Sequence, residues 1–403
     1  MTSVRRDVLV IGGGPAGCAM AIMLRQRGHD VLLVDEAMFP RDKVCGESVS
    51  PEAWRLLGLI GAREAVRRLR PYPLRGMTLV SAQGTTCRGT YRHEGDDMGF
   101  AVRRDVLDHT LLNLAREAGV EVRERTRART IHQHAGTVSG VSVEDAHGSS
   151  RIDARLIVGA DGRRSVVARR LGLLREHRTW RKFSVRGHWR GMQALGPWGE
   201  MHGSVDGGYC GVAPLAPDVA NVAFVLDQRE MTAASSGLEA FYRRELSTRW
   251  PRLAERLRGA ELLARPKAIG PLAIVARRIS VPGALLVGDA AGFYDPFTGE
   301  GVTLALRSAE IAARVADHAL ASGTTDNLSA YDRLRDAATR DKFRLNRILQ
   351  HVVAWPALAD AVARRLAGRP DLADRLVGIA GDFIPARSAL GPKFIWDLLT
   401  ARG

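Results

Sequence analysis

The chain has 403 residues, of which 45% are hydrophobic and 26% are charged, and its formal net charge is +15. This length exceeds one average domain, so we expect one large domain with an insertion, that is, two lobes. Arginine is spread along the whole chain rather than clustered with aromatic residues, which argues against nucleic-acid binding. No apolar run reaches the length that spans a bilayer, so we expect no integral membrane segment.

Cysteine usage and the start of the sequence predict a cytoplasmic, reduced protein. The four cysteines, Cys18, Cys45, Cys87 and Cys210, include no C-x-x-C pair, so we predict neither disulfides nor a metal site. The sequence does not open on a charged and apolar leader, which fits the same compartment. The oligomeric state stays open.

The first predicted unit is a strand, a glycine turn, a helix and a second strand. Residues 7–11 form the short apolar run that is typical of a buried parallel strand, and the glycine-rich stretch 12–17 follows directly. A helix is expected over 18–27, with Ala, Met, Ile and Leu on its inner face. The second strand, 31–34, ends at Asp35.

The rest of the chain alternates between two kinds of structure. Helices are expected over 52–69 and 106–118, and from 302 onward, while 155–161 and 285–288 are each typical of a buried strand that ends in a turn. Alternating patterns predict a single antiparallel sheet, built from strands within 76–91, 182–189, 208–212 and 219–226.

The predicted fold class is α/β, with a Rossmann-type nucleotide-binding domain interleaved with an antiparallel-sheet substrate domain and a helical C-terminus. The segments assigned to the nucleotide-binding domain are 1–75, 99–175 and 275–335; those assigned to the substrate domain are 76–98 and 176–274; the C-terminal helical region is 336–403.

The glycine turn predicts a dinucleotide site. Gly12, Gly14 and Gly17 form a G-x-G-x-x-G pattern between a strand and a helix: the first permits the tight turn, the second lets the backbone approach a pyrophosphate, and the third lets helix and strand pack closely. The helix N-terminus adds a positive dipole for the phosphates. Asp35 is placed to accept hydrogen bonds from an adenosine ribose.

Two later segments repeat the strand-then-acid pattern and distinguish FAD from NAD. They are 157–162, which ends in Asp-Gly, and 285–292, which contains Gly288-Asp289 and continues through 295–301 into a helix. Together with the glycine turn, this set resembles the p-hydroxybenzoate hydroxylase-type flavoproteins, and within them the geranylgeranyl reductase-like branch.

The resemblance implies bound FAD and a role for particular residues. Asp289 would hold the ribityl chain, the loop and helix N-terminus after it would meet the flavin pyrimidine, Asp161 would support the pyrophosphate, and Arg104 would lie near the FAD phosphates. A helix dipole at the pyrimidine would stabilise reduced flavin. The predicted cofactor-binding set is Gly12, Gly14, Pro15, Ala16, Gly17, Asp35, Glu36, Arg41, Gly46, Arg104, Asp161, Gly288, Asp289, Pro296, Gly299, Gly301 and Val302.

The stretch 39–48 is similar to the P-R-x-K-x-C-G segment of the reductase-like branch, which passes beside the flavin. Cys45 is therefore our candidate for a ring-adjacent residue and Glu47 for a proton donor. The alternatives are a small packing residue at Cys45 and a solvated loop carboxylate at Glu47, because an acid is a useful catalyst only when its surroundings move its pKa.

The stretch 208–214 departs from related families. It lacks the tryptophans of the W-x-W-x-I-P segment of flavin-dependent halogenases, which disfavours halogenation, and Gly211 stands where many geranylgeranyl reductases have tryptophan. By the resemblance, Phe183, His188, Trp189 and Tyr209 fall on strands that face the flavin, and we take Phe183, His188 and Tyr209 as candidate substrate-pocket residues. The alternative for each is a core or satisfied surface position.

The predicted activity is FAD-dependent oxidation or reduction of a hydrophobic small molecule, an isoprenoid or polyketide-like secondary metabolite, with hydride transfer through flavin N5. No second glycine motif is present, so NAD(P)H would dock transiently, or a protein or quinol would supply electrons. The alternatives are a monooxygenase that hydroxylates an aromatic or polyketide substrate through a C4a-hydroperoxide and, less favoured, a halogenase or a non-catalytic flavin carrier. The C-terminal helices would pack against the flavin domain, cap a hydrophobic substrate or contact a membrane surface.

Overall fold

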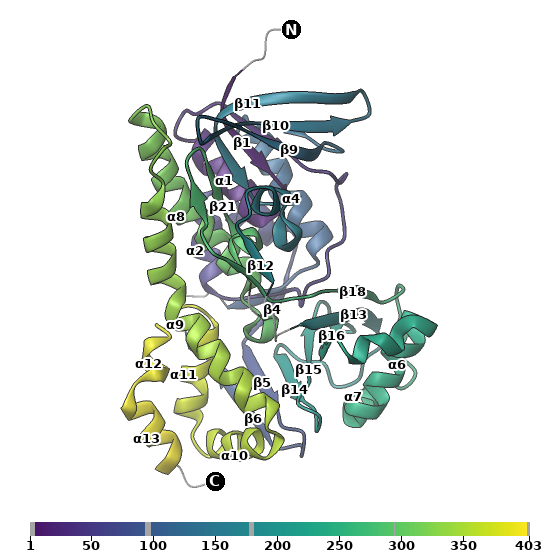
Figure 1. Ribbon diagram of the computed structural model, residues 1–403. Helices are drawn as coiled ribbons and strands as arrows, with labels where there is room; N and C mark the ends of the chain where they lie inside the picture. The colour runs from purple at the N-terminus through teal and green to yellow at the C-terminus, as the bar shows by residue number, and fades with distance from the viewer. Residues whose placement is uncertain (1–4, 93–97, 177–180, 294, 401–403) are drawn as a thin grey trace.

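The computed structural model describes residues 5–92, 98–176, 181–293 and 295–400 and builds them around two large sheets (Figure 1). The first sheet is eight-stranded, and its strand order is β20-β21-β11-β1-β2-β8, with β10 attached to β11 and β9 to β10. The central pairs β21–β11, β11–β1, β1–β2 and β2–β8 are parallel. The bounds are β1 Arg6–Ile11, β2 Val31–Val34, β8 Glu121–Arg123, β9 Arg127–His134, β10 Thr137–Asp145, β11 Gly148–Gly159, β20 Ser280–Val281 and β21 Ala284–Leu286.

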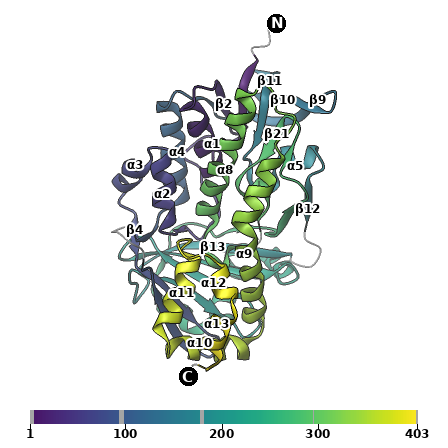
Figure 2. The same cartoon turned by 90° about the vertical axis from the view of Figure 1, so that its left-hand side faces the viewer.

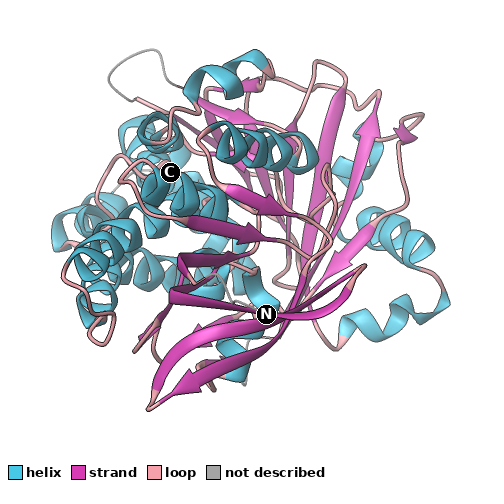
Figure 3. Ribbon diagram, turned by 90° about the horizontal axis from the view of Figure 1, so that it is seen from above, coloured by secondary structure: helices cyan, strands magenta, loops and turns pink. Residues whose placement is uncertain are grey.

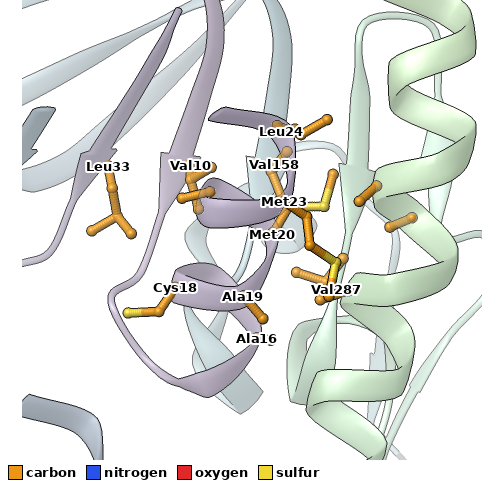
Figure 4. Close-up of a cluster of buried hydrophobic side chains, with 14 of the residues drawn as sticks. Val10, Ala16, Cys18, Ala19, Met20, Met23, Leu24, Leu33, Val158 and Val287 are labelled. Atoms are coloured by element: carbon orange, nitrogen blue, oxygen red, sulfur yellow. The ribbon is translucent and has the colours of Figure 1, made fainter. Parts of the chain in front are cut away.

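The first sheet is buried because helices pack against its apolar strands. Consecutive residues of β1 are fully buried, as expected when both faces of a parallel strand are covered. Helix α1 (Pro15–Arg25) contacts both α4 (Arg104–Glu117) and α8 (Gly301–Ala321). Figure 4 shows Met20 and Met23 of α1 lying between the sheet residue Val158 and Val287. This core fixes the turn between β1 and α1.

The second sheet carries the strands predicted between residues 76 and 226, but it is mixed rather than antiparallel. Its order is β17-β13-β16-β15-β14-β5-β6, with β18 beside β13, and the pair β14–β5 is parallel. The single antiparallel sheet of our prediction is therefore wrong at this one pair, because β5 and β14 run in the same direction where distant parts of the chain meet side by side. The bounds are β5 Gly76–Val80, β6 Thr86–Thr90, β13 Lys182–Arg190, β14 Gly199–Gly203, β15 Tyr209–Pro214, β16 Val219–Asp227, β17 Glu261–Leu262 and β18 Lys267–Ile269.

Two other expectations need correction. The helix predicted over 52–69 is two helices, because Gly61 adopts a left-handed φ of 67° between them. The strand predicted over 155–161 is the end of the much longer β11, which pairs with a hairpin that we did not predict. The remaining small elements are α2 Glu52–Leu59, α3 Arg63–Arg68, α5 Val166–Arg170, α6 Leu238–Arg249, α7 Pro251–Arg256, β3 Ser48–Val49, β4 Tyr72–Leu74, β7 Gly99–Ala101, β12 Leu174–Glu176 and β19 Ile274–Ala276, with 3-10 turns η1 Gly162–Arg164, η2 Glu230–Ser236, η3 Gly288–Ala291 and η4 Pro296–Thr298.

The C-terminal helices cover the second sheet. They are α9 Ser329–Ala354, α10 Pro356–Ala367, α11 Pro370–Ala380, α12 Arg387–Leu390 and α13 Pro392–Thr400. Both α10 and α11 contact β6, and α9 contacts α8 (Figures 1 and 2). Figure 3 shows the chain's end among helices at one side of the strands. The predicted packing against the flavin domain is seen for α9, which contacts α8 and β20, while α10 and α11 lie against the second sheet. Within the ranges given above, none of the helices has the length and apolar character to cross a membrane.

Candidate functional site

The turn between β1 and α1 is shaped by its glycines and held by Asp35. A Cβ on Gly17 would lie 1.8 Å from the Gly12 carbonyl oxygen, and Gly12 itself has a φ of 108°, so neither position accepts a side chain. The Gly13 N–H donates to Asp35 Oδ2 at 2.7 Å. Asp35 is buried. Its hydrogen bond to Gly13 stabilises the turn, in addition to any contact with a ribose.

A cleft of about 120 Å³ opens beyond this turn and gathers segments that are far apart in the sequence. Its lining includes the N-termini of α1 and α8, the loop before β3 and the η3 and η4 turns. Among the predicted residues, the structure brings together Gly14, Pro15, Ala16, Cys45, Gly46, Glu47, Arg104, Gly288, Asp289, Pro296, Gly299, Gly301 and Val302. The three predicted nucleotide-binding segments thus meet in one place.

The remaining predicted cofactor residues lie around the cleft rather than in its lining. The Arg41 guanidinium lies 3.6 Å from the position that a Cβ on Gly14 would occupy, and its Nη1 lies 3.2 Å from Asp108 Oδ2. Asp161 accepts the Val166 N–H at 2.6 Å. Glu36 is exposed and pairs with Arg127 at 3.1 Å, so it is the outermost member of the predicted set.

Charged side chains line the cleft where a pyrophosphate and ribityl chain would lie. Lys43 Nζ is 3.5 Å from Asp289 Oδ2. Burial lowers the pKa of Lys43, while the nearby Asp289 opposes this. Arg104 forms two hydrogen bonds of 2.8 Å to Asp108, and the pair is buried. Asp108 compensates for burial and raises the pKa of Arg104, which keeps the guanidinium charged.

Glu47 is a buried carboxylate with partners on three sides. Its Oε1 accepts the Arg104 N–H at 3.0 Å, while Oε2 accepts from Asn221 Nδ2 at 2.8 Å and lies 2.6 Å from His188 Nε2. Its backbone has a left-handed φ of 59° although it is not glycine. The solvated carboxylate that we considered at this position is therefore excluded, because the side chain is 1% exposed.

The second sheet supplies the groups that hold this loop. Asn221 of β16 also donates to the Cys45 carbonyl oxygen at 2.8 Å. Arg186 of β13 lies 2.8 Å from His188 Nε2 and donates to Asp42 Oδ1 at 2.6 Å. Burial raises the pKa of Asp42, but Lys267 and Arg186 outweigh it and lower the pKa to about 2. Contacts through His188, Arg186 and Asp42 therefore connect Glu47 to the surface. The hydrogen bond from Asn221 holds the Cys45 backbone beside the cleft.

A second, apolar cavity of about 160 Å³ adjoins the cleft. The two share Gly288, Asp289, Phe293, Gly301 and Ala305. A molecule in the cavity would therefore lie directly against the segment 288–301, which we call the flavin loop after its predicted role. Most of its lining comes from β5, β6 and β14 on one side and from α9, α10 and α11 on the other. The aliphatic members include Met77, Leu79, Val80, Met201, Leu304, Leu345, Leu349, Val352, Val353, Ala359, Val362, Ala363, Leu366, Leu376 and Ile379.

Of the three predicted substrate-pocket residues, only Tyr209 lines this cavity. His188 is buried beside Glu47, and Phe183 packs its ring over Gly270, where a Cβ would lie 2.2 Å from the ring. Trp189 donates its indole N–H to Tyr242 in the core of the second lobe. The structure therefore does not support substrate contacts from Phe183 and His188, because their strand presents them to other partners.

Polar groups in the cavity are concentrated next to the flavin loop. Tyr209 donates its hydroxyl hydrogen to Asp295 Oδ1, which also accepts from Gln350 Nε2 at 2.8 Å, and Lys182 Nζ lies 3.6 Å from Asp295 Oδ2. Burial raises the pKa of both Tyr209 and Asp295. This cluster offers hydrogen-bonding groups beside the flavin loop, and the mainly aliphatic lining also includes Ser81, Ser204, Arg335, Thr339, Lys342 and Asn346.

A second polar group ties the C-terminal helices to the flavin loop. Lys342 Nζ of α9 lies 2.5 Å from Glu300 Oε2 and 2.7 Å from Asp382 Oδ1. Burial alone would lower the pKa of Lys342, but the two carboxylates outweigh it and raise the pKa. These ion pairs connect α9 both to the loop before α8 and to the segment after α11, at the wall of the cavity.

Several site residues were missed in the sequence. Lys43 and Arg163 line the cleft, and both belong to motifs that we had singled out, namely P-R-x-K-x-C-G and the second Asp-Gly turn. Their positive charge beside a predicted phosphate site was the available signal. Asn221 and the cavity residues of α9 to α11 carried no such signal, because only the tertiary packing of distant segments places them.

The cleft fits FAD on three structural grounds. The glycine turn leaves Gly14 open toward the cleft, and the N-cap residue of α1 is Gly14 itself, which has no side chain to cap the helix, so the first amides of α1 are available to phosphate oxygens. Asp161 Oδ1 is buried without a protein partner, and burial raises the pKa of this carboxyl group. Basic side chains at Lys43 and Arg104 would balance the phosphate charge.

Comparisons with known proteins agree with this geometry. Residues 5–344 match the family described as "FAD binding domain". The menaquinone reductase of Mycolicibacterium smegmatis is 30% identical over 397 residues, covering 93% of this chain and 92% of that protein. The digeranylgeranylglycerophospholipid reductase of Methanosarcina mazei is 29% identical and covers 79% and 76%. A crystal structure of a flavoprotein/dehydrogenase from Cytophaga hutchinsonii superposes with a TM-score of 0.81 at 23% identity, covering 94% and 93%.

The last of these similarities concerns the fold, and it matches the two-sheet architecture seen here. The family match covers the whole region from β1 to α9, and the named reductases extend over most of the chain. FAD is therefore the cofactor, and the protein is an enzyme. The chain belongs to the FAD-binding-domain family of p-hydroxybenzoate hydroxylase-type flavoprotein oxidoreductases, in its geranylgeranyl reductase-like branch.

Proposed function

We propose that this protein is an FAD-dependent reductase of a hydrophobic molecule with a polar head and a long apolar tail, of isoprenoid or polyketide-like type. The observation that carries the proposal is the wall that the apolar cavity shares with the flavin cleft at Gly288, Asp289, Phe293, Gly301 and Ala305. A substrate in this cavity lies against the flavin loop, and the flavin supplies hydride transfer through N5.

The distribution of polar groups sets the orientation of the substrate. The Tyr209–Asp295 pair lies beside the flavin loop, and because the Tyr209 hydroxyl hydrogen is donated to Asp295, its oxygen, the only phenol oxygen of the described cavity lining, can accept a hydrogen bond from a hydroxyl head group. The aliphatic side chains of α10 and α11 line the part away from this pair. A substrate with its reacting end at Tyr209 and its tail along α10 satisfies both parts of the cavity.

The residues around the cleft then have distinct roles in the proposal. Asp289 and Lys43 hold the ribityl chain, and Arg104, Arg41 and the α1 N-terminus hold the pyrophosphate. Cys45 lies beside the isoalloxazine ring. Glu47 holds the Cys45 turn in place through its bonds to β13 and β16, which replaces the proton donor that we first considered, because its carboxylate already accepts from Arg104, Asn221 and His188.

The named relatives support a prenylated substrate. Two of them are called reductases of menaquinone and of digeranylgeranylglycerophospholipid, and both names describe lipid-like molecules with a long apolar part. The cavity of this chain has the lining that such a tail requires. Gly211, which stands where the related prenyl motif has tryptophan, lies on β15 two residues after Tyr209 and is not in the described lining of the cavity.

Stopped-flow reduction of the purified holoprotein tests the proposal. The flavin is reduced anaerobically with NADPH, NADH or dithionite, and a prenylated quinone is then added. Reoxidation of the flavin with stoichiometric formation of reduced product is expected. Reoxidation only in the presence of oxygen, with a hydroxylated product, would identify the enzyme as a monooxygenase instead. A flavin that neither NADPH nor NADH reduces at a useful rate, and whose dithionite-reduced form the quinone does not reoxidise, would identify a carrier.

A further inference from the structure

We propose that the end of the molecule formed by α10 and α13 is a docking surface for an anionic lipid bilayer, from which a hydrophobic substrate enters the cavity. We call it the α10–α13 face and define it by Trp355, Leu358, Ile395, Trp396 and Leu399. Figures 1 and 2 show both helices at the end of the molecule where the chain terminates. The two helices also contact each other.

The first observation is the exposure of large apolar side chains on this face. Trp355 and Trp396 are 69% and 68% exposed, and Leu399 is 62% exposed. Tryptophan is the residue that proteins place at membrane interfaces, because its ring is amphipathic. A solvated protein surface rarely gathers such side chains without a partner.

The second observation is that α13 is apolar on both its inner and outer sides. Phe394 is buried in a cluster with residues of α10 and α11, while Ile395 and Trp396 point away from that cluster and remain exposed. A helix with this distribution has its inner side satisfied by packing and its outer side left for another apolar phase.

The third observation is the charge around the face. From Arg344 to the end of α13, the side chains that the structure describes as exposed and charged are Arg344, Arg347, Arg364, Asp371, Arg387 and Lys393. Arg364 and Lys393 pair with Asp360 and Asp397 on their own helices, so the excess of positive charge comes from Arg344, Arg347 and Arg387. Basic residues beside an apolar helix favour the negative surface of a bilayer with acidic lipids. They disfavour a second copy of the same face, which would bring like charges together.

The fourth observation connects the face to the cavity. The inner side of α10 contributes Pro356, Ala359 and Ala363 to the cavity lining, only one to five residues from the exposed Trp355 and Leu358. On the other side of the α9–α10 junction, a Cβ on Gly207 in the β14–β15 turn would lie 3.2 Å from Ala354. The exposed apolar side chains of this face and part of the cavity wall therefore belong to the same helix, so a bilayer at the face would lie one helix away from the cavity.

Sedimentation with lipid vesicles tests the proposal on the complete holoprotein. We expect binding to vesicles that contain phosphatidylglycerol and weaker binding to phosphatidylcholine alone. The double variant Trp355→Ser, Trp396→Ser should bind about tenfold or more weakly, and Arg347→Glu with Arg387→Glu should remove the preference for the acidic lipid. Leu334→Ser is the matched control, because Leu334 is exposed on α9 but lies at the other end of that helix.

Vesicle binding that is unchanged in the tryptophan variant would overturn the proposal, and so would equal binding to both lipids. Concentration-dependent dimers that the tryptophan variant abolishes would assign the face to a second copy instead. Flavin absorbance and far-UV circular dichroism show whether each variant is folded. The inference rests on the proposed function for its biological reason, but the vesicle assay needs no turnover, so a wrong substrate and a wrong surface give different results.

Discussion

Glu47 and His188 join the two lobes at the flavin cleft: the Oε2 and Nε2 atoms lie 2.6 Å apart although 141 residues separate them in the chain. Glu47 belongs to the loop before β3, and His188 to β13 of the second sheet. The relative position of the cleft and the substrate cavity therefore depends on a contact between a carboxylate and an imidazole, both buried.

Replacing Glu47 by Ala is expected to lower the free energy of unfolding by roughly 3 kcal/mol, because it leaves three donors buried without an acceptor. Urea unfolding of the holoprotein measures this. A proton donor without a structural role would instead leave stability unchanged and reduce only turnover. Asn221→Ala, which removes the amide that donates to Glu47 and to the Cys45 carbonyl, should cost about 1 kcal/mol and also shift the visible flavin spectrum.

Asp289→Ala is expected to lose most of the bound flavin while the protein stays folded. The carboxylate lies in the wall between the cleft and the cavity, and only Lys43 is near it among the described ion pairs. The ratio of flavin to protein absorbance after gel filtration measures retention. Asp153→Ala, on β11 away from the cleft, serves as the control. Full yellow colour in the Asp289 variant contradicts the assignment.

Cys45 should be the first thiol to react with iodoacetamide in the native protein. It is partly exposed, while Cys18, Cys87 and Cys210 are buried. Burial also raises the pKa of Cys18, and raises that of Cys87 to about 11, which keeps these thiols protonated. Mass spectrometry of the labelled peptides identifies the site, and added FAD should slow labelling if Cys45 lies beside the ring. Equal labelling with and without FAD argues against that position.

Much of the fold follows from local sequence, while the site depends partly on contacts between distant segments. The glycine turn could be predicted because Gly12, Gly17 and the flanking apolar runs act within one short unit. The burial of Glu47 could not, since Asn221 and His188 approach from strands whose pairing no local pattern encodes. The parallel pair β14–β5 was missed for the same reason.

A larger side chain in the cavity should restrict the enzyme to substrates with shorter apolar tails. Ala363 lines the cavity, whereas Ala357 on the same helix is exposed. Ala363→Leu is expected to raise KM for a long-tailed substrate about tenfold and to change kcat/KM for a short analogue little, since loss of tail contacts affects binding more than the reacting end. Ala357→Leu should match the parent protein. An equal loss for both substrate lengths would place the tail elsewhere.

Glu200 makes the protein sensitive to acid. Burial would raise its pKa, but His202 and Arg256 outweigh this and lower the pKa from 4.5 to about 2. A depressed pKa stabilises the fold above pH 4.5, and this stabilisation is lost as the pH falls toward 2. Between pH 4.5 and 2 the free energy of unfolding of Glu200→Gln should fall less than that of the parent protein, by up to about 3 kcal/mol. Urea titrations at several pH values measure it, with the exposed Glu255→Gln as control.

The order of functional segments along the chain has an evolutionary consequence. Every cleft-lining residue precedes the start of α9 at Ser329, while α9 to α11 supply one whole wall of the apolar cavity. Apart from Lys342 and Gln350, which bond to Glu300 and Asp295, cavity residues of these helices can therefore change which molecule is accommodated while the lining of the cleft stays the same. Proteins with the same flavin-binding cleft could therefore come to accept different substrates through changes in their C-terminal helices.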